Sequence, residues 1–180
     1  MPDEPKRKPR PPLGAEGLER LALFYAGRYA TTRAKLRAYL ARKIAERGWE
    51  GEGPAEAAAE RLVERLAELR YVDDRAFAAS RAAALGRRGY GERRVRDALA
   101  AAGIAEEDGA EAREQARDGA WEAALRFAER RRIGPFAAAE TDRAGREKWM
   151  AAMIRAGHPP TLCRRLVTAP RGTIPEPDGF

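Results

Sequence analysis

The sequence predicts an all-α protein, built from three tandem three-helix repeats that stack into an elongated, curved array. Among its 180 residues are 39 Ala and 30 Arg, and both residue types favour helices. Only four Val, five Ile and six Thr are present, which is too few β-branched side chains for the core of a sheet. A glycine that follows each of three helical patterns at nearly constant spacing indicates repetition.

The repetition is defined by a Gly followed by an apolar or ring residue. The three pairs are Gly48-Trp49, Gly103-Ile104 and Gly157-His158, whose glycines lie 55 and 54 residues apart. Gly is the favoured residue just past a helix end, because it has no Cβ to oppose a left-handed backbone. Each repeat is therefore predicted to contain a helix that ends at this glycine.

In the first repeat, residues 18–27 form the first predicted helix. Thr31 or Thr32 is the expected N-cap of the second helix, and Gly53-Pro54 begins the third. The apolar positions at helical spacing are expected to face inward: Leu36, Leu40 and Ile44 on the second helix, and Leu62, Val63, Leu66 and Leu69 on the third.

The second and third repeats follow the same plan. In the second repeat, Asp73 or Asp74 is expected to cap a helix that carries Phe77. The next helix begins at Gly91-Glu92 with Val95 and Leu99 inward, and 105–117 forms the third. In the third repeat, a helix marked by Trp121, Leu125 and Phe127 precedes helices over 143–156 and 160–167.

These elements divide the chain into five segments. A Pro-rich basic tail is expected to be disordered over 1–17, and a second loose tail over 170–180. Between them lie the three repeats, 18–74, 75–119 and 120–169. We expect no membrane span, because no apolar run approaches 18 residues. No secretion signal is evident either, so we expect a cytoplasmic protein.

Few residues suggest chemistry. Asp73-Asp74 is the only prominent carboxylate pair, and helix capping is its expected role. Gly86, Gly89 and Gly91 lack the spacing of a phosphate loop and are expected in a turn between helices, with Tyr90 either packed on the helix entry or exposed for contact. The chain has one His and one Cys, so we expect no metal site, no cofactor and no catalytic residue.

The cations gather in two blocks. Residues 33–47 hold six cations against one acid, and residues 81–97 hold six Arg against two acids, whereas 105–118 holds six acids against two Arg. Coding bias does not explain this segregation, and Arg suits carboxylates, phosphates and planar bases. The candidate partner or nucleic-acid contacts are Arg33, Arg37, Arg42, Lys43, Arg81, Arg87, Arg88, Arg93 and Arg94.

One ordered set of motifs resembles the RecX family. The set comprises 71–78 (Tyr-Val-Asp-Asp-Arg-Ala-Phe-Ala), then 87–99 with its Arg-rich Gly89-Tyr90-Gly91, then Gly103-Ile104. The first repeat is similar too, in 22–25 and 32–36, and the resemblance spans about residues 18–169. The structural motif residues are Asp73, Asp74, Phe77, Gly89, Tyr90, Gly91 and Gly103.

The resemblance implies a regulatory role. RecX-like proteins bind the RecA nucleoprotein filament and inhibit its recombinase, ATPase and coprotease activities in DNA repair and the SOS response, without catalysis of their own. The implied partner is therefore the RecA filament, with possible direct DNA contact, and we expect a monomer. The alternative, which needs only the basic helices, is a general DNA- or RNA-binding helical repeat module. An adaptor for another acidic protein is a weaker hypothesis.

Overall fold

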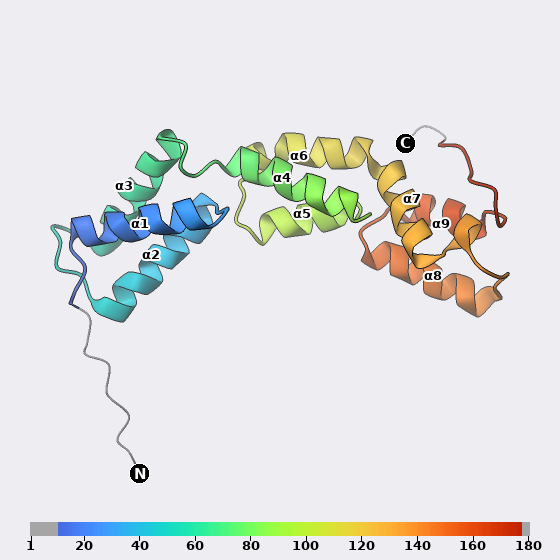
Figure 1. Ribbon diagram of the computed structural model, residues 1–180, viewed down its shortest axis with the longest axis horizontal. Helices are drawn as coiled ribbons and strands as arrows, with labels where there is room; N and C mark the ends of the chain where they lie inside the picture. Colours follow the sequence, from blue (N-terminus) through green and yellow to red (C-terminus); the bar gives the residue numbers. More distant parts are fainter. Residues whose placement is uncertain (1–10, 178–180) are drawn as a thin grey trace, which may run out of the picture. The chain divides into compact units, whose positions relative to one another are not determined.

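The computed structural model describes residues 11–177, and within them it has nine α-helices, one 3₁₀ helix and no β-strand (Figure 1). The helices form three successive groups of three, so the predicted all-α, tandem three-helix plan is confirmed. The backbone divides into two compact units, the first ending at Asp74 and the second beginning at Arg75. The first unit contains one helix group, and the second contains the other two.

The first group packs around its own apolar core. It consists of α1 (Ala15–Arg28), α2 (Arg33–Arg47) and α3 (Ala55–Glu68). Thr32 is the N-cap of α2, and its hydroxyl accepts a hydrogen bond from the backbone N–H of Lys35 at 3.1 Å. The largest buried side chains of this core are Leu13, Leu18, Leu36, Leu40, Val63 and Leu66. Leu69, which was expected to face inward, is 56% exposed because the helix ends at Glu68.

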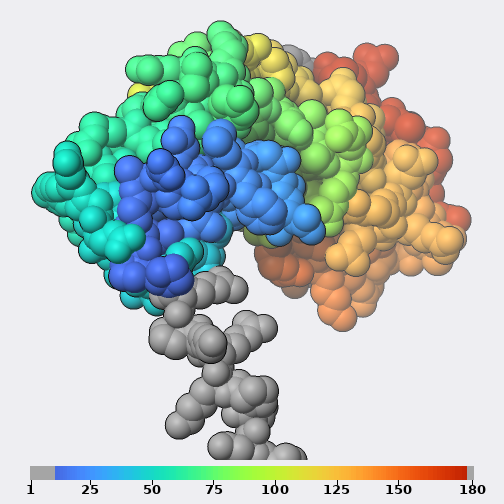
Figure 2. All heavy atoms as spheres, turned by 60° about the vertical axis from the view of Figure 1, so that its left-hand side comes forward, coloured from blue at the N-terminus to red at the C-terminus, as the bar shows by residue number. Residues whose placement is uncertain are grey.

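The chain before α1 belongs to this core. Leu13 is 1% exposed, and its backbone N–H and C=O bond with Gly48 and Glu50 in the loop after α2. In Figure 2 the dark-blue start of the described chain lies against that loop. Residues 11–17 thus differ from the disordered tail expected over 1–17, because one large apolar residue, Leu13, anchors them. Residues 1–10 lie outside the described part of the chain.

The second group consists of α4 (Asp74–Arg87), α5 (Glu92–Ala100) and α6 (Glu106–Asp118). Gly91 is the N-cap of α5, and Val95 and Leu99 are each 1% exposed, as predicted. Phe77 packs against the core that these two residues share with Ala78, Leu85 and Ile104. The buried positions of α6 are Gly109 and Ala112, so this helix meets the core through small residues.

The third group consists of α7 (Ala120–Arg131), α8 (Arg143–Arg155) and α9 (Pro160–Thr168), with a 3₁₀ turn at Gly134–Phe136 between α7 and α8. Its core includes Trp121, Phe127, Ile133, Met153, Leu162 and Leu166. Beyond α9, Arg171 donates to the carbonyls of Ala137 and Ala138. These bonds fix the first residues of the segment that was expected to be loose, and 178–180 lie outside the described residues.

Candidate functional site

The end of α8 and the start of α5 meet through their backbones. The N–H of Gly91 donates to the carbonyl of Ala156 at 3.0 Å, and the N–H of Arg93 donates to the carbonyl of Gly157 at 3.3 Å. The first N–H groups of one helix thereby satisfy the last carbonyls of another, which also aligns the two helix dipoles favourably. The second and third helix groups are joined by this contact.

Glycine is required where these backbones touch. Gly157 has φ +97°, and a Cβ there would lie 2.5 Å from the backbone nitrogen of Arg94. A Cβ on Gly91 would lie 2.5 Å from the carbonyl oxygen of Gly157, and one on Gly89 would lie 2.7 Å from the backbone nitrogen of Phe127. The predicted turn role of Gly89 and Gly91 thus has a second physical reason, which is close packing against the third helix group.

His158 lies beneath this contact. The side chain is 3% exposed, and its Nε2 lies 3.0 Å from the carbonyl oxygen of Gly89. Because a carbonyl only accepts, Nε2 carries a proton. Burial lowers the pKa of His158 to about 4, and it raises the pKa of the neighbouring Cys163 thiol to about 11. Both residues are therefore uncharged packing residues at neutral pH.

Tyr90 gathers arginines around its ring. It is half-buried and packs against the cores of both the second and the third helix groups. The guanidinium carbons of Arg88, Arg94 and Arg130 lie 5.4, 5.8 and 6.0 Å from the ring centroid, which is cation–π range. We call these four residues, Arg88, Tyr90, Arg94 and Arg130, the arginine seam.

The seam carries uncompensated positive charge. All three arginines are exposed, and within residues 11–177 none of them makes an ion pair with an acidic side chain. Arg126, on the same helix as Arg130, adds a fourth guanidinium, whose Nε donates to the carbonyl of Gly86 at 3.2 Å. The cation–π contacts hold the side chains without neutralising them, so the surface is suited to an anionic partner.

The other candidates in the second helix group fall into two kinds. Arg93 is engaged structurally, since its guanidinium donates to the carbonyl of Ile154 at 2.7 Å, near the end of α8. Arg81 and Arg87 are exposed on α4, and neither forms an ion pair with another described residue. They enlarge the basic surface without belonging to the seam.

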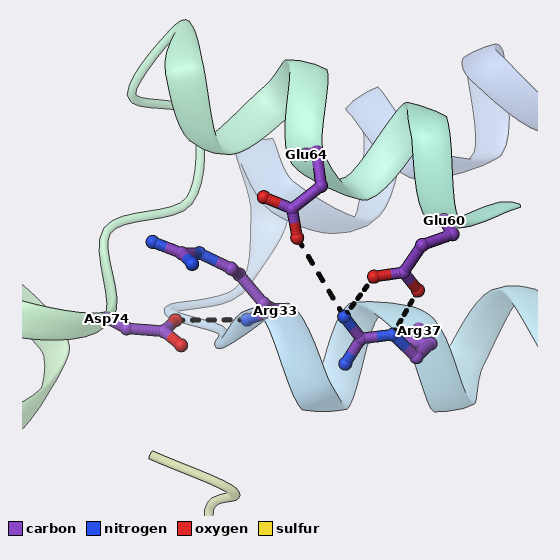
Figure 3. A network of polar contacts seen from close by, with 5 residues as sticks. All are labelled: Arg33, Arg37, Glu60, Glu64 and Asp74. Atoms are coloured by element: carbon purple, nitrogen blue, oxygen red, sulfur yellow. Dashed lines mark hydrogen bonds and ion pairs between the residues drawn. The ribbon is translucent and has the colours of Figure 1, made fainter. Parts of the chain in front are cut away.

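Most of the candidates on α2 form ion pairs, and Figure 3 shows those of Arg37. Arg37 binds Glu60 through two nitrogens at 2.5 and 2.6 Å, and Glu64 lies 3.9 Å away. The pKa of the Glu60 carboxyl is lowered by this hydrogen bond. Lys43 and Arg42 share Glu46, at 2.5 and 3.6 Å. We call Arg37, Arg42 and Lys43 with Glu46, Glu60 and Glu64 the α2 ion-pair cluster.

One member of the predicted carboxylate pair caps a helix that lies far away in the sequence. Asp74 is 5% exposed, and its Oδ1 accepts a hydrogen bond from the backbone N–H of Arg33 at 3.0 Å (Figure 3). It therefore helps to cap α2, 41 positions earlier in the chain, rather than only its own helix. Asp73 forms an ion pair with Arg70 at 3.7 Å. Among residues 11–177 no group of His, Cys, Asp and Glu is arranged to hold a metal ion.

Two arginines, one in the seam and one beside it, were missed by the sequence prediction. Arg126 and Arg130 lie in the third helix group, about 40 residues from Tyr90 in the sequence. Nothing in the local pattern of 120–131 distinguishes them from other solvated arginines on a helix. Only the docking of α7 on the glycine turn brings Arg130 to Tyr90 and Arg126 to the Gly86 carbonyl.

Fold and site together define an all-α protein of tandem three-helix groups, with an unpaired arginine seam where the second group meets the third. No protein-family model matches the sequence, and no curated protein matches it either. Within residues 11–177, no helix is long and apolar enough to span a membrane.

Two solved structures share this architecture. The crystal structure of RecX from Lactobacillus salivarius has a TM-score of 0.67 and 15% sequence identity, and the match covers 85% of this chain and 94% of that one. A crystal structure of regulatory protein RecX has a TM-score of 0.62 and 19% identity, and covers 84% of this chain and 72% of that one. The chain therefore has the fold of RecX proteins, which confirms at the level of the fold the resemblance seen in the motifs.

Proposed function

We propose that this protein is a RecX-type regulator that binds the RecA nucleoprotein filament and inhibits RecA recombinase, ATPase and coprotease activity. The observation that carries the proposal is the coincidence of two resemblances. The RecX fold extends over 85% of the chain, and the family's Asp-Asp, Phe-Ala and Gly-Tyr-Gly motifs stand at 73–78 and 89–91 within it.

The arginine seam is the proposed contact surface. Its three exposed guanidiniums form no ion pair with an acidic side chain among the described residues, so they remain available for carboxylates or phosphates. The Gly89-Tyr90-Gly91 motif builds the seam, since the glycines permit close docking and the tyrosine orients the arginines. A motif with this geometry serves binding and needs no catalytic group. The proposed protein is a monomeric, cytoplasmic, non-enzymatic regulator.

The test is an ATPase assay on RecA. The protein is added at sub-stoichiometric amounts to RecA on single-stranded DNA, and ATP hydrolysis is followed over time. We expect hydrolysis to fall, because a regulator that acts on a filament affects many subunits through few binding events. Unchanged hydrolysis over the whole titration would refute the proposal.

The second candidate function, a general DNA- or RNA-binding module, is favoured by the same unpaired arginines. If inhibition begins only when the protein exceeds the available DNA sites, competition for DNA is the better explanation. Salt dependence separates the two further, because a protein that neutralises several phosphates loses affinity steeply and linearly in log salt. We expect filament binding to have a shallower slope than binding to bare DNA.

A further inference from the structure

Three tyrosines of the first helix group form a row of ring contacts. Tyr25 on α1 and Tyr39 on α2 have ring centroids 4.2 Å apart and planes inclined by 13°. Tyr29, the C-cap of α1, continues the series at 5.4 Å from Tyr25, with the planes tilted by 51°. We call Tyr25, Tyr29 and Tyr39 the tyrosine ladder.

The ladder is anchored at one end and open at the other. Tyr25 and Tyr39 are half-buried and pack against the core of the first helix group. Tyr29 is 51% exposed, so much of its ring faces solvent. The inner pair holds the outer ring in place, and the outer ring offers a fixed aromatic surface at little further cost in side-chain entropy.

Cations flank the ladder along its length. Arg28 lies over the Tyr29 ring at 5.8 Å, and its Nε donates to the Tyr29 hydroxyl at 3.3 Å. Arg42 and Lys43 lie over the Tyr39 ring at 5.6 and 5.8 Å. Within residues 11–177, Arg42 and Lys43 share the single carboxylate of Glu46, so positive charge is left over beside the rings.

We propose that the tyrosine ladder is a binding site for single-stranded nucleic acid, with an unpaired base stacked on Tyr29 and the adjoining phosphates on Arg28 and Arg42. Exposed aromatic faces interleaved with cations are what such strands require, because each nucleotide presents one flat ring and one negative charge. A duplex hides its base faces and would contact only the cations. The site lies on α1 and α2 and shares no residue with the arginine seam, and the proposal does not depend on RecA.

The experiment measures fluorescence anisotropy of a labelled oligothymidylate of about 12 nucleotides, a length within the usual range for such sites. We expect Tyr29→Ala to weaken binding about tenfold, since stacking of one base contributes on that scale. Tyr29→Phe keeps the ring and is expected to bind within about twofold of the unsubstituted protein. Far-ultraviolet circular dichroism of each variant checks that helix content is unchanged.

Tyr71→Ala is the matched control, because Tyr71 is the same residue type in the same unit, is 56% exposed, and stacks on no other ring among residues 11–177. It is expected to bind normally. An abasic strand of equal length provides the second control: it should bind about tenfold more weakly, and Tyr29→Ala should not weaken it further. The proposal is overturned if Tyr29→Ala binds normal strands with unchanged affinity, or if it loses as much affinity for abasic strands as for normal ones. It is also overturned if Tyr71→Ala weakens binding as much as Tyr29→Ala does.

Discussion

Residues 33–47 and residues 81–97 each carry six cations, yet their surroundings differ. In the first segment, Arg37 lies 2.5 Å from the Glu60 carboxylate, which α3 supplies. In the second, Arg88 and Arg94 lie over the Tyr90 ring, and the facing helix, α7, adds Arg130 to the same ring. Carboxylates thus neutralise part of the charge in the first region, including that of Arg37, whereas Arg88 and Arg94 in the second keep theirs.

The side chains that the facing helix supplies therefore determine whether a basic segment is neutralised or keeps its charge. An arginine paired with a half-exposed carboxylate contributes to stability and presents little net charge. An arginine held by an aromatic ring keeps its whole charge. The α2 ion-pair cluster is therefore expected to matter for folding, and the arginine seam for binding.

The largest expected effect comes from separating the helices that build the seam. Gly157→Ala combines backbone strain at φ +97° with a Cβ 2.5 Å from the Arg94 nitrogen, and we expect it to lower the free energy of unfolding by about 4 kcal/mol. Urea denaturation followed by circular dichroism measures this. Gly53→Ala is the matched control, since its φ is +70° with nothing within 4 Å, and strain alone should cost about 1 kcal/mol. Equal losses in the two variants would show that the backbone contact is unimportant.

Reversing charge in the seam should affect binding and spare the fold. We expect Arg88→Glu with Arg94→Glu to weaken inhibition of RecA ATP hydrolysis about a hundredfold, since two charge-assisted contacts are lost. Arg93 is left intact because its guanidinium binds the Ile154 carbonyl. The control is the double variant Arg61→Glu with Arg164→Glu, which makes the same change in net charge at exposed sites on α3 and α9. It should inhibit RecA ATP hydrolysis normally. Equal losses in both double variants would indicate a non-specific charge effect.

Most of the fold could be predicted from the sequence, because helix ends are marked locally. Gly103 and Gly157 have φ of +70° and +97°, as terminators should, and α8 begins at Arg143 as expected. Two further ends are closed by Arg70 and Arg132 at φ of 59° and 54°. Arginine is not a recognised terminator, so these ends carry no sequence signal.

The candidate site was less predictable, because its charge state depends on contacts between distant residues. The pairing of Arg37 with Glu60 joins α2 to α3, and the approach of Arg130 to Tyr90 joins α7 to the glycine turn. Local patterns show that both segments are basic but not which charges are neutralised. The cap that Asp74 provides for α2 could not be predicted either, because it joins residues that are 41 positions apart.

Acid should destabilise the protein through the buried His158, which lies beneath the seam. The pKa of His158 is about 4 in the folded protein against 6.5 as its ordinary value, so the unfolded chain binds the proton more readily. The contribution of neutral His158 to the free energy of unfolding is fully present above pH 6.5. It is lost as the pH falls towards 4, and the loss is about 2 kcal/mol at pH 4.5. Urea midpoints measured between pH 7 and 4.5 check this. His158→Gln removes the titrating group, and a slope as steep as in the unsubstituted protein would contradict the assignment.

The smallest expected effect tests the α2 ion-pair cluster. Glu60→Gln removes the charge that binds Arg37 through two nitrogens, but both side chains are nearly half exposed, at 46% and 44%, so solvent already screens the pair. We expect a loss of about 0.5–1 kcal/mol at pH 7 and low salt, which shrinks in concentrated salt. Because the pKa of Glu60 is lowered from 4.5, this contribution is present above that value and disappears as the pH falls through the folded pKa.

Glu64→Gln provides the matched control, because Glu64 lies 3.9 Å from the same guanidinium on the same helix. Glu64→Gln should lower the free energy of unfolding less than Glu60→Gln does. Neither variant should change the amount of protein that half-inhibits RecA. A Glu60→Gln protein with normal stability and weakened inhibition would reverse the comparison, and would place the functional charge on α2 instead of the arginine seam.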